Sequence, residues 1–461
     1  MSNTTLASQR IASLLDENSF VEIGALVTAR ATDFNLKQTE TPSDGVVPGY
    51  GVIDGNLVYV YSQDASVLNG SVGEMHAKKI TKIYDLALKT GAPVIGLIDS
   101  TGLRLQEATD ALNAFGEIYM KQTMASGVIP QITAIFGNCG GGLAIIPTLT
   151  DFTFMESKSA KLFVNAPNAL DGNTVAKCDS ASSEFHAKES GIVDVVADEA
   201  DLLNQVRALV AMLPSNFEEE AVVDCADDLN RACATLESAK GNMVAALAEL
   251  SDNAQVFEIK KDYATDMVTA FIKLNGMTVG AVANNEDTLS IKGSYKAADF
   301  VRFCDAFNIP VLTLTNVKGY EATIGSEKGI ATAVAKLTHA FASATVPKVN
   351  VVVGDAFGSA YVAMNSKAIG ADIVMAWPNA QIGAMDATLA AKIMYDGKDS
   401  DTIKAKANEY KELQNSALSA ARRGYVDHIV QPADTRKYVI GAFEMLYSKV
   451  DNAPAKKHGT V

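Results

Sequence analysis

The feature that most constrains this chain is an internal repeat with a spacing of 217 residues. Pro93 and Val94 recur as Pro310 and Val311. The same spacing relates further identical pairs, namely Gly102 and Gly319, Ser126 and Ser343, Pro130 and Pro347, Gly137 and Gly354, and Gly141 and Gly358. Agreement at one spacing over about fifty residues is the mark of a duplicated structural unit. The chain is therefore expected to fold as two copies of one domain.

The repeated unit predicts an α/β fold. In the first copy, runs 93–99 and 129–136 are short, apolar and rich in β-branched residues, which is typical of buried strands. Between them, Leu112, Phe115 and Tyr119 are spaced for one face of a helix. Each copy is expected to hold strand, loop, helix, strand, glycine turn and helix in that order.

Two glycine-bearing loops follow successive strands in each copy. They contain Gly102 and the pair Gly141-Gly142 in the first copy, and Gly319 and the pair Gly358-Ser359 in the second. Because ligands bind outside the carboxyl ends of parallel strands, the two loops of one copy are expected to form a single site.

The turn at Gly140-Gly141-Gly142 is expected to work through its backbone. Glycines let a ligand approach the main chain closely, and the helix predicted over 143–146, which Pro147 should end, adds free N–H donors at its start. Such a device serves phosphate binding or oxyanion stabilisation. The run lacks the Lys and Ser/Thr that end a P-loop and lacks the dinucleotide fingerprint. A tight turn whose glycines serve only packing is the alternative.

Composition excludes several classes of function. The 461 residues carry a formal net charge of −15, which argues against nucleic acid and against an anionic membrane surface. The polar N-terminus and the lack of an apolar run near the roughly 18 residues of a spanning helix predict a soluble, cytoplasmic protein. Five scattered cysteines and five scattered histidines predict neither a disulfide framework nor a metal site.

Several longer motifs resemble one family, the acyl-CoA carboxyltransferase subunits of biotin-dependent enzymes. The resemblance covers nearly the whole chain and rests on segments 44–47, 70–76, 99–107, 126–132 and 137–142 in the first copy, and on 275–284, 302–310, 376–378, 424–427 and 434–436 in the second. Family members include the carboxyltransferase β subunits of acetyl- and propionyl-CoA carboxylase and the α subunits of methylmalonyl- and glutaconyl-CoA decarboxylase.

The resemblance implies an α/β fold of two tandem crotonase-like (ClpP/crotonase) domains, each a spiral of ββα units. With the boundary placed in the acidic stretch between the copies, the expected domains are 1–228 on the acyl-CoA side and 229–461 on the biotin side. Subunits of this family place the first domain of one copy against the second domain of another. The chain is thus expected to be at least a homodimer, with a trimer of dimers as the larger alternative.

The resemblance also gives the glycine loops their roles. Gly102, Leu103, Arg104, Gly141 and Gly142 would bind the acyl-CoA, and backbone N–H groups around Leu103 and Gly141-Gly142 would hold the thioester oxygen as enolate charge forms.

On the biotin side, Gly319, Tyr320, Gly358, Ser359 and Ala360 would bind the biotin of a separate carrier protein. N–H groups around Tyr320 and at Gly358-Ser359 would hold its ureido oxygen. The expected catalytic groups are thus backbone donors, with no side-chain acid, base or nucleophile and no metal.

The chain departs from the family pattern in the second copy. Asn316-Val317-Lys318-Gly319-Tyr320 stands where Asp-x-Pro-Gly-Phe is usual, and the usual Tyr-Gly-Gly-Ala-Tyr is Phe357-Gly358-Ser359-Ala360-Tyr361. Ser359 keeps its N–H but adds a Cβ beside the ligand, and Lys318 adds a positive charge.

The leading hypothesis is a carboxyltransferase acting between carrier-bound carboxybiotin and acetyl-, propionyl- or methylmalonyl-CoA. Its partners would be a biotin carboxyl carrier protein and a biotin carboxylase. One alternative is the α subunit of a sodium-pumping acyl-CoA decarboxylase, whose partner would be a membrane decarboxylase subunit. A second is an enoyl-CoA hydratase or isomerase with Glu107 as its acid or base, and a third is a non-catalytic scaffold subunit of a carboxylase complex.

Overall fold

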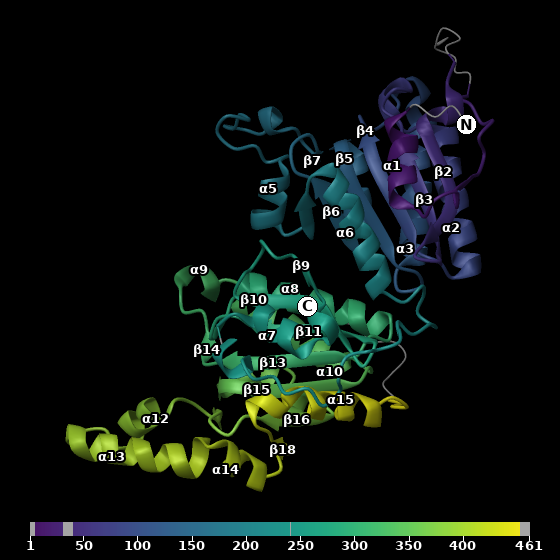
Figure 1. The fold of residues 1–461 in the computed structure, drawn as a ribbon. Coiled ribbons are helices and arrows are strands. Elements are labelled where there is room, and N and C mark those ends of the chain that lie inside the picture. Colours follow the sequence, from purple (N-terminus) through teal and green to yellow (C-terminus); the bar gives the residue numbers. More distant parts are fainter. Residues whose placement is uncertain (1–4, 31–39, 240, 452–461) are drawn as a thin grey trace. The chain divides into compact units, whose positions relative to one another are not determined.

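The computed structural model describes residues 5–30, 40–239 and 241–451 (Figure 1). It divides into two compact units, Met1–Glu220 and Ala221–Val461. The segment that opens the second unit is bonded within it, because Thr278 N donates to Ala221 O and Val223 N donates to Gly276 O, both at 3.0 Å. The division thus falls eight residues before the boundary expected between residues 228 and 229.

The first unit is built on a sheet with the strand order β1-β2-β3-β4-β5-β6-β8, and β7 pairs with β5. Its strands are β1 (Val21–Glu22), β2 (Val46–Ile53), β3 (Asn56–Gln63), β4 (Val94–Ser100), β5 (Gln131–Gly140), β6 (Phe152–Glu156), β7 (Lys161–Phe163) and β8 (Val195–Ala197). Its α-helices are α1 (Leu6–Leu14), α2 (Glu74–Thr90), α3 (Ala108–Ala125), α4 (Ile145–Leu149), α5 (Ser183–Phe185) and α6 (Glu199–Met212). From β3 onward the neighbouring strands are parallel.

Helices cover both faces of this sheet (Figure 1). On one face, α2 and α3 pack together and bury Ile80, Ile83 and Phe115 against strand residues such as Tyr61. On the other face, α6 contacts α1 and several strands. The predicted helix stripe is correct for Phe115, but Leu112 is 63% exposed, so its expected place on the buried face is wrong.

The glycine turn begins later than the sequence suggests. Strand β5 continues to Gly140, and a 3-10 helix, η4 (Gly141–Ala144), leads directly into α4. Pro147 is the third residue of α4 rather than its end. Because the first N–H groups of a helix have no intrahelical partner, a proline in the first turn removes no bond.

The second unit repeats this plan. Its main sheet has the order β18-β16-β15-β13-β11-β10-β9, with β17 paired to β15, and β12 and β14 form a separate pair. Its strands are β9 (Val256–Ile259), β10 (Met267–Leu274), β11 (Met277–Asn284), β12 (Thr288–Leu289), β13 (Val311–Val317), β14 (Gly319–Tyr320), β15 (Lys348–Phe357), β16 (Ile373–Ala376), β17 (Gln381–Gly383) and β18 (His428–Ile429).

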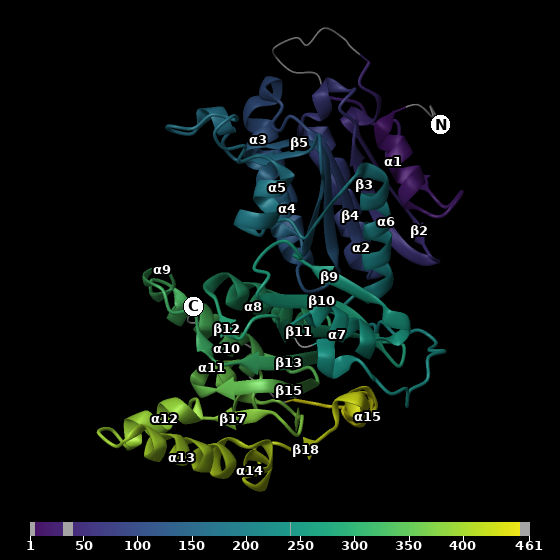
Figure 2. The same cartoon turned by 60° about the vertical axis from the view of Figure 1, so that its left-hand side comes forward.

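The α-helices of the second unit are α7 (Met243–Leu250), α8 (Ile291–Ala306), α9 (Ile324–Glu327), α10 (Ile330–Ser343), α11 (Gly358–Ala363), α12 (Ala387–Met394), α13 (Ser400–Tyr410), α14 (Ala417–Arg422) and α15 (Thr435–Met445). Helices α12, α13 and α14 lie together at one end of the unit (Figure 2). No helix in the described ranges is both long enough and apolar enough to cross a membrane.

The duplication extends to individual residue pairs. After a shift in register, Ser100 pairs with Cys139 between β4 and β5, and Val317 pairs with Ala356 between β13 and β15. Each residue of the second pair lies 217 positions after its counterpart. Gly141 and Gly358, also 217 apart, both have φ of 62°. The expected internal duplication is confirmed, and the two units share the same loop geometry where a site is expected.

Candidate active sites

The first candidate site begins at the loop after β4. Gly102 has φ of 98°, and a Cβ there would lie 3.0 Å from the carbonyl oxygen of Gly140, so the two glycine loops of this unit touch. The N–H of Gly102 donates to Ser100 Oγ at 3.1 Å and is therefore not a free donor. Gly102 contributes a backbone conformation that glycine favours.

Leu103 carries the candidate donor on this loop. Val72 N donates to Gly102 O at 2.8 Å, and Arg104 N donates to Val72 O at 3.0 Å. In such a parallel bridge the residue between the two bonded positions directs its own N–H away from the partner strand. The N–H of Leu103 therefore points away from Val72.

Two further candidate donors lie at the start of η4. Gly141 and Gly142 are its first two residues, so their N–H groups have no intrahelical acceptor. A Cβ at Gly141 would meet no atom within 4 Å, while one at Gly142 would lie 3.2 Å from the hydroxyl oxygen of Tyr119. That hydroxyl donates to Gly142 O and holds the turn from α3.

The charged residues near this loop are used within the fold. Arg104 is 1% exposed and donates to Asp44 Oδ1 at 2.7 Å, Glu107 Oε1 at 2.8 Å and Ser71 O at 2.7 Å. Burial raises the pKa of Asp44 against the opposing effect of Arg104. The guanidinium is thus a structural group, and any contact of Arg104 with an acyl-CoA is left to its backbone.

Glu107 is also engaged, since it accepts from Arg104 and, at 2.6 Å, from the N–H of Glu74 at the start of α2. It is 4% exposed. A buried carboxylate whose oxygens already accept hydrogen bonds within the fold is not free to reach a substrate. Cys139 is buried, and burial raises the pKa of its thiol, so it is no nucleophile.

The second candidate site has the same backbone plan. Glu321 N donates to Leu289 O at 2.9 Å, and Leu289 pairs with Tyr320, so the N–H of Tyr320 points away from β12. Gly358 and Ser359 are the first residues of α11, which again leaves their N–H groups without intrahelical acceptors.

A cavity of about 480 Å³ lies at this site. The structure brings all five residues expected on the biotin side into its wall, namely Gly319, Tyr320, Gly358, Ser359 and Ala360. Lys318 and Phe357, which belong to the two loop motifs noted in the sequence, also line the cavity, and sequence reasoning missed Ala384, Met385, Asp386 and Leu389. Segment 384–389 follows β17, which pairs with the far end of β15, and only that pairing brings it to the site.

Two side-chain contacts connect the loops of this cavity. The hydroxyl of Tyr320 donates to Ser359 Oγ at 2.7 Å. Lys318 Nζ lies 2.8 Å from Asp287 Oδ2 and 3.7 Å from Asp355 Oδ2, and its hydrogen bond to Asp287 raises its pKa. The charge of Lys318 is therefore compensated by two carboxylates.

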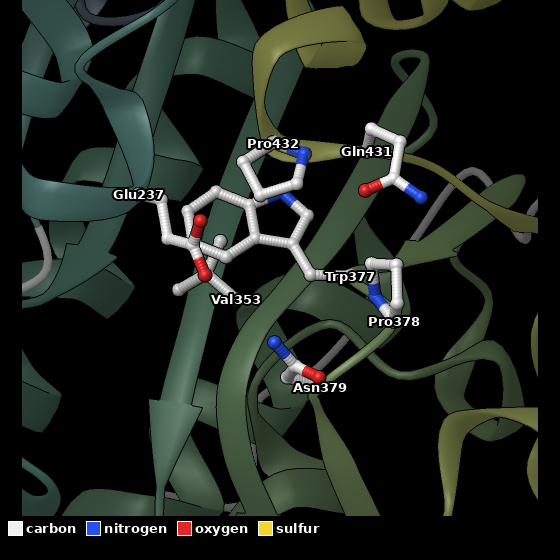
Figure 3. A pocket seen from close by; sticks show the side chains of 7 residues that line it. All are labelled: Glu237, Val353, Trp377, Pro378, Asn379, Gln431 and Pro432. Atoms are coloured by element: carbon white, nitrogen blue, oxygen red, sulfur yellow. The ribbon is translucent and has the colours of Figure 1, made fainter.

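A smaller cavity of about 280 Å³ lies elsewhere in the second unit, and Figure 3 shows side chains around the indole of Trp377. Its lining comprises Glu237, Val353, Trp377, Pro378, Asn379, Gln431 and Pro432. The indole N–H donates to Thr435 Oγ1 at 3.0 Å, and the fully buried Arg436 pairs with Asp227 at 3.1 Å and with Asp252. Motifs 376–378 and 434–436 therefore form buried contacts within the second unit.

Two α/β units of one plan, each with a pair of loops that offer backbone N–H groups, define a crotonase-like protein with two related candidate sites. In a comparison with protein families, the family model described as the carboxyl transferase domain matches residues 2–461 of this chain. The α subunit of methylmalonyl-CoA decarboxylase from Propionigenium modestum is 40% identical over 478 residues, which cover 99% of this chain and 92% of the relative. The β chain of propionyl-CoA carboxylase from Roseobacter denitrificans is 41% identical over 474 residues, covering 99% and 93%.

Among solved structures, transcarboxylase 12S, described as a hexamer with hydrolysed methylmalonyl-coenzyme A bound, superposes with a TM-score of 0.94. It is 38% identical, and the match covers 99% of this chain and 92% of the other. The chain belongs to the carboxyl transferase domain family, and the expected crotonase-like fold and carboxyltransferase activity are confirmed.

Proposed function

We propose that this carboxyltransferase moves a carboxyl group between biotin on a carrier protein and the α-carbon of a small acyl-CoA, with methylmalonyl-CoA and propionyl-CoA as the pair of substrates. The relatives whose names contain these two compounds support that choice. The observation that carries the proposal is the pair of equivalent donor sites, in which the N–H groups of Leu103 and Gly142 recur as those of Tyr320 and Ser359.

The first site would bind the acyl-CoA thioester. The N–H groups of Leu103, Gly141 and Gly142 would donate to the thioester oxygen, and they would do so more strongly as that oxygen gains enolate charge. Because these donors are fixed by β4, β5 and the hydroxyl of Tyr119, they need little reorganisation during the reaction.

The second site would bind biotin, and its geometry fits that group. The cavity of about 480 Å³ is within the usual range for a small organic ligand, and it presents the N–H groups of Tyr320 and Ser359 to a carbonyl oxygen. When bound, biotin would carry the carboxyl group on a ring nitrogen and accept the α-proton of the substrate there once that group has left. The donors would stabilise the negative charge on the ureido oxygen.

This chemistry uses no side-chain base, which agrees with the engaged Glu107 and the buried Cys139. An enoyl-CoA hydratase would need such a base, so that alternative loses its candidate residue. The decarboxylase alternative uses the same two sites in the reverse direction. A scaffold without activity is opposed by the intact donor geometry in both units.

The test is transfer by the purified chain. With methylmalonyl-CoA labelled in its free carboxyl group and free biotin, we expect labelled carboxybiotin and propionyl-CoA in equal amounts, and a panel with acetyl-CoA and propionyl-CoA in the reverse assay will rank the acyl groups. Light scattering should show at least a homodimer, and the hexamer of transcarboxylase 12S supports a trimer of dimers. If the purified chain neither transfers the carboxyl group nor binds an acyl-CoA, the proposal is wrong.

A further inference from the structure

The two candidate sites differ at the side chains of their donor residues. Leu103 and Gly142 in the first unit occupy the positions of Tyr320 and Ser359 in the second. Leucine and glycine have no side-chain hydrogen-bonding group, whereas Tyr320 and Ser359 bond to each other at 2.7 Å. The backbone plan was duplicated, and a hydroxyl pair is present only in the second copy.

The hydroxyl pair spans the site. Tyr320 comes from β14, which follows β13, and Ser359 comes from the start of α11, which follows β15. Both residues line the cavity of about 480 Å³. The bond therefore connects, across the ligand cavity, the two residues whose N–H groups are the proposed donors.

The first unit holds its glycine turn in another way. There, Tyr119 on α3 donates to the carbonyl oxygen of Gly142. The equivalent position in the second unit is Lys336 on α10, whose ammonium lies 4.9 Å from the ring centroid of Tyr295. The second turn thus lacks the tie from its helix and has instead the tie from Tyr320.

The direction of this bond determines what Ser359 can do. A serine hydroxyl has one proton to donate and two lone pairs to accept. Since Ser359 Oγ accepts from Tyr320, its own proton is available to a second acceptor. Ser359 is exposed toward the cavity, and a hydroxyl that accepts one hydrogen bond becomes a better donor for the next.

We propose that the hydroxyl of Ser359, oriented by Tyr320, is a third hydrogen-bond donor to the ligand oxygen at the second site, beside the N–H groups of Tyr320 and Ser359. The inference rests on the proposed function, in which that ligand is the ureido group of biotin. Ser359 is then a catalytic residue through its side chain as well as its backbone, and Tyr320 is a positioning residue through its hydroxyl.

The test uses the full chain with Tyr320→Phe, Ser359→Ala and the double variant. Each single variant keeps its backbone N–H and loses one hydroxyl. Calorimetric titration with free biotin should show affinity reduced roughly two- to twelvefold for each single variant, as expected for one lost hydrogen bond. The double variant should be no weaker than Ser359→Ala, because Tyr320 acts through Ser359.

Turnover provides the second readout. The kcat for transfer to biotin should fall at least tenfold in each single variant, because the third donor gains strength with the negative charge, while the KM for acyl-CoA stays unchanged. Ser359→Thr, which restores a hydroxyl, should recover part of the loss. Tyr425→Phe, which removes the hydroxyl of an exposed tyrosine in the same unit, is the matched control and should leave biotin affinity unchanged.

Three results would overturn the inference. The first is a Ser359→Ala variant with unaltered biotin affinity and kcat, and the second is a Tyr320→Phe variant with unaltered biotin affinity and kcat. The third is a loss of biotin affinity or kcat on Tyr320→Phe that persists when Ser359 is already alanine. If the unaltered chain neither binds biotin nor transfers a carboxyl group to it, the proposed function fails, and this inference fails with it.

Discussion

A proline at position 142 gives the most direct test of the first donor site. The neighbouring Gly141 is unsuitable, because its φ of 62° is far from the value near −65° that proline requires. Gly142 has no positive φ and is the second residue of η4, where a proline fits the helix start and removes only an N–H without an intrahelical acceptor. Gly142→Pro therefore removes a proposed donor with little change to the fold.

The matched control is Gly142→Ala. A Cβ at this position would lie 3.2 Å from the hydroxyl oxygen of Tyr119 in both variants, so both share the contact at Cβ, and the proline adds only its ring carbons Cγ and Cδ. Only the proline removes the N–H. The ratio of the two variants thus isolates the donor from the added atom.

The expected magnitude follows from the role of the donor. Loss of one preorganised oxyanion donor typically lowers kcat by about 10²- to 10³-fold, which corresponds to about 2.7–4 kcal/mol of transition-state stabilisation. Transfer from methylmalonyl-CoA to free biotin should fall by that factor in Gly142→Pro relative to Gly142→Ala, while the melting temperatures stay similar. If the two variants turn over within about threefold of each other, the N–H of Gly142 does not stabilise the enolate.

Three further predictions concern stability. Burial lowers the pKa of His76 to about 3, so the folded state binds fewer protons than the unfolded state between pH 6.5 and 3. The stability that the neutral His76 contributes is complete above pH 6.5 and is lost as the pH falls toward 3. In His76→Gln, the free energy of unfolding measured with denaturant should therefore depend less steeply on pH. Arg104→Met should lower the free energy of unfolding by about 3–5 kcal/mol, because it leaves buried carboxylates without their partner. Gly137→Ala should lower the melting temperature, because its Cβ would lie 1.9 Å from a carboxylate oxygen of Asp99. The control is Gly116→Ala on the exposed side of α3, whose Cβ would meet no atom within 4 Å; it should raise the free energy of unfolding by about 0.5–1 kcal/mol.

The duplication and the positions of the glycine loops could be predicted from the sequence alone. Identical residues at one spacing revealed the duplication, and the glycines at positions 102, 141, 319 and 358 marked both pairs of loops. At positions 102, 141 and 358 the glycines take a positive φ, which leaves glycine as a signal at a single position, whereas Gly319 has no positive φ and its Cβ would meet no atom within 4 Å.

The features that were missed depend on residues far apart in the chain. Asp44 and Arg104 form a buried ion pair across sixty positions, and no local pattern separates them from surface charges. The bond between Tyr320 and Ser359 likewise arises only when β13 and β15 are neighbours. Leu112 was misplaced because helical spacing gives a stripe but not its edges.

The buried network around Arg104 has a consequence for the time course of ligand binding. It connects Asp44 in the turn that precedes β2, the start of α2 and the loop that carries Leu103, so that loop opens only when a buried ion cluster opens with it. The amide protons of Arg104 and Glu107, which are bonded to Val72 O and Arg104 O, should then exchange with solvent at rates close to those of the adjacent β4, with or without acyl-CoA. The first site is set when the domain folds, and substrate arrival has little left to order.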